Sequence, residues 1–367
     1  MSKITKVCHA SLCALLFHSA VFAGQPVVNF LNWSQYIGPD VIPGFQNASG
    51  IKVNQNFFDS EDMLLSLLLA GGSGYDLAIM DLADIPQQSA AGVLQPLDKT
   101  KIPNLKYADA NLYKIAAETD PNNTYGVIYQ YGTTGIAYNE KMIAKVLGPD
   151  VKIDSWEFLY NPKYLQKLQT CGVAFLDESN SIFALGKHYL GLDPNSTNPA
   201  DYRKVTAYMM KIRPYISYFD NNRYIPDLAS GNICIAMAYS GDVLRAKQQA
   251  EQAGANVDIH YVIPKEGTSI WFDMLVMSKT APHKDNAYQF INYILDPKVM
   301  ADTSNYLYQP NAVPGSTPYL NPILQDPAFT PTPAMLNKLF AARTQPPRLD
   351  ELVSQLWFQI KYGVDMD

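Results

Sequence analysis

Three short apolar segments near the N-terminus alternate with two helical ones, and this order limits the possible folds more than any other feature. The strand-like segments are residues 27–31, 51–57 and 75–80, and the helical segments are residues 41–49 and 63–70. Four of the first five residues in the first segment are apolar, as in a strand buried on both faces. A β-α-β-α-β order implies parallel strands with right-handed crossovers, so we predict an α/β protein.

The same logic recurs further along the chain. Residues 172–176 and 231–239 have the pattern of buried strands, and each precedes polar residues and a helix. Residues 270–277 form a late strand of the same kind, and residues 284–297 an amphipathic helix. We interpret the strand-like residues 133–139 as the point where the chain leaves a first lobe. A chain of 367 residues is long enough for two domains.

The first 23 residues have the features of a secretion signal. Lys3 and Lys6 precede an apolar run over residues 10–22, and Val21-Phe22-Ala23 is typical of a cleavage site. No other segment approaches the roughly 18 apolar residues that a membrane span needs. Loss of the two signal lysines changes the formal charge from −6 to −8. This charge argues against nucleic acid or anionic membrane as a partner, and we expect an exported protein.

Two cysteines, Cys171 and Cys234, remain once the signal is removed. An even number in an oxidising compartment favours a disulfide, and two separate buried thiols are the alternative.

Motifs typical of enzymes are missing from the sequence. His188, His260 and His283 are not spaced like a metal-binding pair, and no nucleophile elbow, Walker loop or dinucleotide motif occurs. We therefore predict a protein that is not an enzyme and has no cofactor and no metal.

Aromatic and acidic residues gather where the predicted strands end. They are Trp33, Tyr36, Asp81, Glu178, Tyr239, Asp242, Trp271 and Asp273. In open α/β sheets, ligands bind beyond the carboxyl ends of the strands. An aliphatic diamine needs carboxylates for its ammonium groups and flat apolar walls for its methylenes, and aromatic faces also attract cations. Each residue has a simpler alternative role: Asp242 as a helix cap, Glu178 as a solvated helix start, Trp33 and Trp271 as core.

Several longer segments resemble those of a known family. They are residues 32–36 (NWSQY), 74–77, 91–99, 133–139, 171–177, 191–197, 241–243 and 263–267. On these segments the chain resembles the periplasmic polyamine-binding proteins of spermidine/putrescine ABC importers, and the putrescine-binding branch most closely. The paired cysteines also match that branch, which supports the disulfide.

The resemblance implies a two-lobed periplasmic binding protein of type II. Each lobe would be a mostly parallel sheet flanked by helices, with two chain crossovers at a hinge. One lobe would comprise residues 24–133 and 271–314, and the other residues 134–270 and 315–367. A small polyamine would be clamped between the lobes of a monomer and delivered to a membrane permease and its ATPase.

The resemblance also implies roles for individual residues. Asp242 and Asp273 match ammonium-binding acids, Tyr239 a stacking aromatic, and Tyr308 a tyrosine of the cleft. The complete expected ligand site is Trp33, Ser34, Gln35, Tyr36, Asp81, Glu178, Ser181, Asn221, Tyr239, Asp242, Trp271, Asp273 and Tyr308.

The positions of the acids depart from the family pattern. Gln35 and Ser181 stand where acids are usual, whereas Asp81 and Glu178 are acids where small residues are usual in the putrescine branch. Because acid positions set the spacing of bound ammonium groups, the ligand could instead be a guanidino compound, an amino acid or a metal-bound species. A polyamine sensor that presents its bound state to a receptor is a further alternative.

Overall fold

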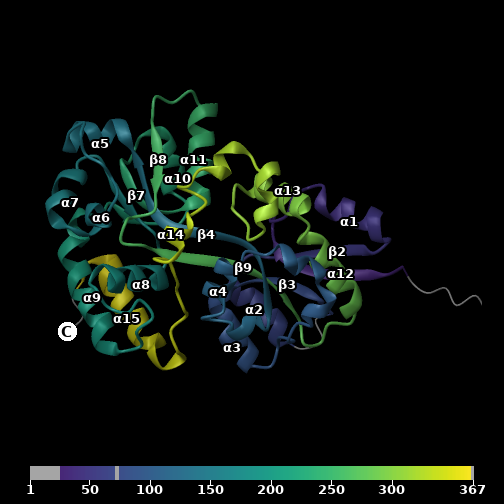
Figure 1. Cartoon of the computed structure of the whole chain (residues 1–367). Helices are drawn as coiled ribbons and strands as arrows, with labels where there is room; N and C mark the ends of the chain where they lie inside the picture. The colour runs from purple at the N-terminus through teal and green to yellow at the C-terminus, as the bar shows by residue number, and fades with distance from the viewer. Residues whose placement is uncertain (1–24, 71–73, 365–367) are drawn as a thin grey trace, which may run out of the picture.

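The protein has two lobes, and a pair of long strands runs from one lobe into the other (Figure 1). The computed structural model describes residues 25–70 and 74–364, so the predicted signal at residues 1–23 lies outside it. No helix in the described ranges combines the length and apolar character needed to cross a membrane.

The first lobe begins with the predicted β-α-β-α-β unit. Strands β1 (Val27–Trp33), β2 (Lys52–Phe58) and β3 (Leu77–Asp81) are parallel in the order β2-β1-β3. Helices α1 (Val41–Ser49) and α2 (Glu61–Leu69) connect them, and the α1 C-cap Gly50 has φ 73°. Of the apolar face predicted for α2, Leu64 and Leu68 are buried, but Met63 is 41% exposed.

Strand β1 is buried on both faces, as its sequence predicts. On one face Phe30 packs against Phe290, with ring centroids 5.5 Å apart, and Phe45 of α1 completes this aromatic group. On the other face Leu31 packs into the core that contains Leu64 of α2. The helices of this lobe that follow α2 are α3 (Ile85–Ala90), α4 (Ala110–Ala116), α12 (Lys284–Ile294) and α13 (Pro297–Leu307).

The second lobe repeats this plan with shorter strands. Its strands are β5 (Val173–Phe175), β6 (Tyr218–Phe219), β7 (Ile235–Tyr239) and β8 (Ile259–Val262). Strand β5 pairs in parallel with both β6 and β7. Its helices are α5 (Glu140–Leu147), α6 (Glu157–Tyr160), α7 (Pro162–Leu168), α8 (Ser179–Tyr189), α9 (Pro199–Ile212), α10 (Tyr224–Ser230) and α11 (Ser240–Gln252).

Strands β4 (Gly126–Asn139) and β9 (Ser269–Met277) pair antiparallel and extend through both lobes. Strand β9 also pairs with β3 in the first lobe, and β4 with β7 and β8 in the second. In the described ranges, every antiparallel pair of strands therefore involves β4 or β9. The sheet is mixed, because the other pairs are parallel. Strand β4 begins seven residues before the predicted strand at residue 133.

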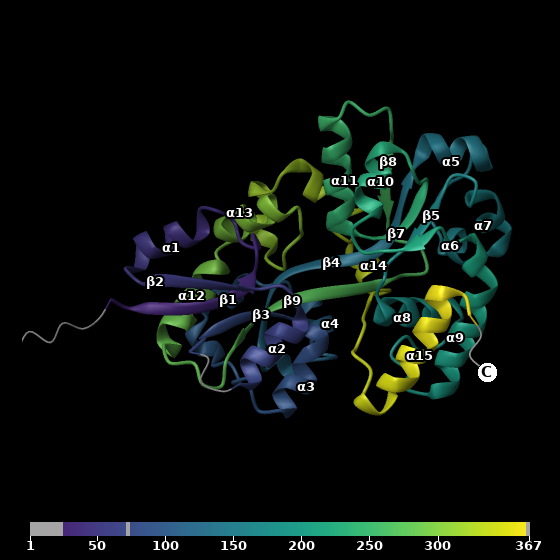
Figure 2. The same cartoon turned by 180° about the vertical axis from the view of Figure 1, so that it is seen from behind.

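The C-terminal segment makes a third passage between the lobes, so the two crossovers that the resemblance implies are one too few (Figure 2). The turn Pro314–Tyr319 still packs against α13 of the first lobe. Strand β10 (Phe340–Ala341) then pairs in parallel with β9. After α14 (Pro333–Leu336) and β10, helix α15 (Asp350–Tyr362) packs on α9 of the second lobe.

The predicted disulfide between Cys171 and Cys234 is present, with Cα atoms 5.4 Å apart. Cys234 directly precedes β7 and Cys171 lies two residues before the start of β5, and these strands pair from Val173 and Ile235 onward. The disulfide therefore joins the starts of two neighbouring parallel strands in the second lobe.

Replacing both cysteines by serine is expected to lower the free energy of unfolding by about 2–4 kcal/mol. The disulfide closes a loop with a sequence separation of 63, and losing that loop frees the unfolded chain. Denaturant unfolding of the double variant measures the change. Because the bond lies outside the cavity described below, ligand affinity is expected to stay the same, and equal unfolding free energies would contradict the prediction.

Candidate functional site

A cavity of about 890 Å³ lies where the two lobes face each other. Its walls come from the ends of β1, β3 and β7 and from the stretch of β9 between the lobes. This volume is in the range of small-molecule binding sites. Carboxyl ends of parallel strands from both lobes meet here, as the sequence predicts.

Most of the expected ligand-site residues line this cavity. They are Trp33, Tyr36, Asp81, Glu178, Ser181, Asn221, Tyr239, Asp242, Trp271 and Asp273. Their contact with a ligand stays a prediction.

Three expected residues, Ser34, Gln35 and Tyr308, do not line the cavity. Ser34 and Gln35 are exposed, and Gln35 has a left-handed backbone with φ 56°. Tyr308, also at φ 56°, accepts a hydrogen bond from Gln248 of α11. The next residue, Gln309, lines the cavity instead.

Trp271 and Tyr239 form an aromatic wall of the cavity. Their rings meet edge to face, with centroids 6.3 Å apart and planes at 88°. The indole of Trp271 lies against Gly132 on β4, where an added Cβ would be 2.1 Å from Trp271 Cζ2. Glycine at position 132 therefore allows the indole to lie against the neighbouring strand.

Trp33 combines the two roles considered for it. It lines the cavity, and its ring also packs against the buried ring of Phe58, with centroids 4.2 Å apart. This contact with the core fixes the indole as a wall of the cavity.

Two carboxyl groups face each other on neighbouring strands of the first lobe. Asp81 on β3 is the direct partner of Asp273 on β9 in the antiparallel ladder. Asp81 Oδ1 accepts a hydrogen bond of 2.6 Å from the amide of Ala83, and the Tyr36 hydroxyl donates to Asp273 Oδ2. The Tyr36 hydroxyl also lies 2.6 Å from Gln309 Oε1.

The pKa of each acid in this pair is raised. Burial, reinforced by the charge of Asp273, raises the pKa of Asp81 to about 8. Burial raises the pKa of Asp273 to about 6, although the hydrogen bond from Tyr36 opposes this effect. At neutral pH the pair therefore holds close to one proton, and an ammonium group would favour its loss.

The carboxylate of Asp242 is already paired in the second lobe. Its Oδ1 accepts from Arg245 Nη2, and its Oδ2 accepts from the buried hydroxyl of Tyr224. Burial raises the pKa of Asp242 despite the opposing charge of Arg245. The side chain does not cap α11, because the N-cap is Tyr239. The helix-cap alternative for Asp242 is therefore wrong.

Glu178 and Asn221 are held by the backbone around them. Glu178 caps α8, accepting 2.9 Å and 2.5 Å hydrogen bonds from the amides of Asn180 and Ser181. Asn221 accepts from the amide of Asp177 and donates to its carbonyl. Both residues shape the cavity wall while their polar atoms stay bonded to the protein.

Several residues that line the cavity were not expected from the sequence. They are Asp84, Thr134, Asn180, Arg245, Ser269, Gln309 and Arg343. The place of Arg245 beside Asp242 could have been predicted, because it follows Asp242 by three residues on a predicted helix and therefore lies on the same face. The place of Arg343 could not, since it reaches the cavity from the distant C-terminal passage.

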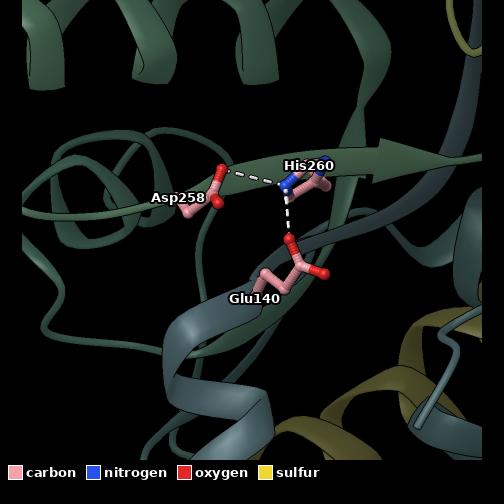
Figure 3. A group of neighbouring side chains, drawn as sticks. All are labelled: Glu140, Asp258 and His260. Atoms are coloured by element: carbon pink, nitrogen blue, oxygen red, sulfur yellow. Dashed lines mark ion pairs between the residues drawn. The ribbon is translucent and has the colours of Figure 1, made fainter. Parts of the chain in front are cut away.

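One group of potential metal ligands occurs within the described residues, outside the cavity (Figure 3). His260 Nε2 lies 2.9 Å from Asp258 Oδ1 and 3.1 Å from Glu140 Oε2. The carboxyl side chains of Asp258 and Glu140 are 47% and 60% exposed. Exposed ion pairs to the imidazole account for this arrangement.

Comparisons with known proteins agree with this fold. Residues 41–332 match the family model described as bacterial extracellular solute-binding protein. The chain is 40% identical over 343 residues to the putrescine-binding periplasmic protein PotF of Escherichia coli K12, covering 93% of each chain. It is 37% identical over 342 residues to the putrescine-binding periplasmic protein SpuD of Pseudomonas aeruginosa, again covering 93% of each.

A solved structure shows the same architecture. The spermidine/putrescine ABC transporter substrate-binding protein PotD of Streptococcus pneumoniae, crystallised with calcium and HEPES, superposes with a TM-score of 0.81. It is 25% identical, and the match covers 92% of this chain and 99% of that one. The fold class and the family resemblance predicted from the sequence are thus confirmed. With a cavity between two lobes and relatives that are binding proteins rather than enzymes, the chain belongs to the bacterial extracellular solute-binding proteins.

Proposed function

We propose that the protein is the solute-binding component of an ABC importer and binds a small polyamine or a close derivative in the periplasm. The observation that carries this proposal is the Asp81–Asp273 pair in a cavity with aromatic walls. Each carboxylate offers an ammonium group a charge-assisted hydrogen bond. Relatives whose names specify putrescine support the same ligand class.

The aromatic side chains suit the aliphatic part of such a ligand. Trp33, Tyr239 and Trp271 present large apolar surfaces around the acids. Methylene groups that pack against these rings leave water, and a nearby cation gains from the ring faces. The site therefore offers one surface for charge and another for the hydrocarbon chain.

Lobe closure provides the mechanism. The ligand contacts both lobes fully only when they are closed, so binding shifts the population toward the closed form. Strands β4 and β9 join the lobes and supply the hinge, with proposed lobes of residues 24–133 and 271–314, and of residues 134–270 and 315–367. The closed monomer then delivers its ligand to a permease and ATPase, after export directed by residues 1–23.

A thermal-shift panel tests this proposal. The panel contains putrescine, cadaverine, agmatine, spermidine and spermine, each at 1 mM. A ligand that binds the folded state alone stabilises it by about 2.7 kcal/mol at roughly 100 times its Kd, so the melting temperature should rise for at least one amine. A flat response to all five would contradict the proposal, and sodium chloride at matched ionic strength is the control.

A further inference from the structure

The two sides of the cavity offer different chemistry to a ligand. On the first-lobe side, no Lys or Arg of the described chain forms an ion pair with Asp81 or Asp273. On the second-lobe side, the buried carboxylate of Asp242 is paired with Arg245. Of these three buried or partly buried aspartates, only Asp242 is therefore already neutralised by a cation from the described part of the protein.

The ion pair between Arg245 and Asp242 compensates for the burial of the Asp242 carboxylate. Asp242 is 6% exposed, and a buried carboxylate without a counter-charge is strongly unfavourable. Arg245 lies one turn along α11 and neutralises it, while Tyr224 occupies the second oxygen. A second cation brought to Asp242 would either displace the guanidinium or lie beside it, and neither arrangement gains net neutralisation.

The other acid on this side, Glu178, is also engaged. Its two oxygens accept the amides of Asn180 and Ser181 at the start of α8. The helix N-terminus carries a partial positive charge that already complements this carboxylate. Each oxygen of Asp242 and of Glu178 thus already accepts a hydrogen bond from the protein.

The group that faces the cavity beside Asp242 is a hydrogen-bond donor. The Arg245 side chain is 54% exposed, lines the cavity, and within the described chain is bonded to Asp242 through Nη2. Guanidinium and ammonium groups both donate hydrogen bonds and accept none. A carbonyl oxygen, in contrast, accepts from a guanidinium, so Arg245 is complementary to a ligand with an acceptor at this end.

We propose that the preferred ligand is an aliphatic amine with one ammonium group and a neutral carbonyl acceptor at its other end, and that Arg245 selects it. A monoacylated diamine has this form. The ammonium lies at Asp81 and Asp273, the methylenes pack along Trp271 and Tyr239, and the carbonyl accepts from Arg245. A carboxylate in place of the carbonyl is disfavoured, because Arg245 is already neutralised by Asp242 and offers no net positive charge to balance it. This inference rests on the proposed function and narrows its ligand class.

Isothermal titration of the wild-type protein and Arg245→Gln tests the inference. The probes are putrescine, N-acetylputrescine and 4-aminobutanoate at pH 7.5. The wild-type protein is expected to bind N-acetylputrescine about tenfold more tightly than putrescine, the effect of one charged hydrogen bond, and 4-aminobutanoate more weakly than N-acetylputrescine. In Arg245→Gln, which frees Asp242 for a second ammonium, the preference should reverse toward putrescine.

Lys247→Gln is the matched control. Lys247 lies on the same helix, α11, but does not line the cavity, so its loss removes the same charge without touching the site. Its ligand preference should equal that of the wild type.

Several results would overturn the inference. One is wild-type protein that binds putrescine or 4-aminobutanoate more tightly than N-acetylputrescine. Another is an unchanged preference in Arg245→Gln. If the two proteins bind none of the amines, the proposed function fails together with the inference, whereas tight putrescine binding alone overturns only the inference.

Discussion

Asp273→Asn is expected to weaken amine binding by roughly 30-fold to a few thousand-fold, or about 2–5 kcal/mol. The amide keeps the shape of the side chain but removes the negative charge opposite Asp81 on the neighbouring strand. A buried ammonium group then loses a counter-charge that no Lys or Arg of the described chain already occupies. Isothermal titration with the best ligand of the thermal-shift panel measures the loss.

Asp285→Asn is the control for this experiment. Asp285 belongs to the same lobe but its side chain is 81% exposed, so the variant changes the net charge equally without altering the cavity. Its affinity should match that of the wild type. Unchanged affinity in Asp273→Asn would remove Asp273 from the ligand site.

Amine affinity is expected to rise by about tenfold per pH unit between pH 6 and pH 8. The pKa of Asp81 is raised to about 8 and that of Asp273 to about 6, so the free pair holds protons that a bound ammonium displaces. Each displaced proton makes binding stronger at higher pH by about 1.4 kcal/mol per unit, until the pH passes the pKa of the free group. Titrations in buffers with different ionisation enthalpies count the protons released.

Asp81→Asn separates this effect from other pH dependence. Below pH 8 the variant should show a flatter affinity profile, because the group with the higher pKa is gone. A carboxyl group whose folded pKa exceeds its unfolded value binds more protons when folded, so Asp81 makes the ligand-free protein less stable as the pH rises from 4 to 8. Asp81→Asn should therefore raise the melting temperature at pH 8. Equal slopes of affinity against pH in both proteins would contradict the assignment.

The β-α-β-α-β unit could be predicted because local patterns determine it. Apolar runs, helical spacing and the C-cap Gly50 are each visible within a short window of sequence. The first half of β4 could not be predicted from such short patterns. Its buried Gln130 interrupts the apolar run, and the bond from Ser304 that satisfies it comes from a distant helix.

The site was predicted where strand ends position the side chains, and missed where turns do. Trp33, Asp81, Tyr239 and Asp273 follow from strand register and lie in the cavity. A residue with a left-handed backbone points its side chain in a different direction from that of a residue in an extended strand. No short sequence pattern predicts the φ of 56° at Gln35 or Tyr308. Gln35 and Tyr308, which the resemblance placed in the ligand site, therefore do not line the cavity.

Two acids with the same role in the family pattern have different surroundings in the structure. The family pattern gives Asp242 and Asp273 the same role. In the structure, Asp242 forms an ion pair with the guanidinium of Arg245, whereas Asp273 is paired across the strands with Asp81. The difference arises from Arg245 and Asp81, the side chains next to these two acids.

The three passages of chain between the lobes restrict how the cavity can open. Strands β4 and β9 are hydrogen-bonded side by side, and β10 of the C-terminal passage pairs with β9 near Ser269. Sliding one passage past another would break ladder hydrogen bonds, whereas bending the sheet keeps them. In the lobe closure proposed above, the aspartates of one lobe and Arg245 of the other would therefore approach each other by bending of this shared sheet. A ligand bound to one lobe would then meet the groups of the other lobe after one bending motion. Because folding has already ordered these side chains relative to each other, binding would lose less conformational entropy.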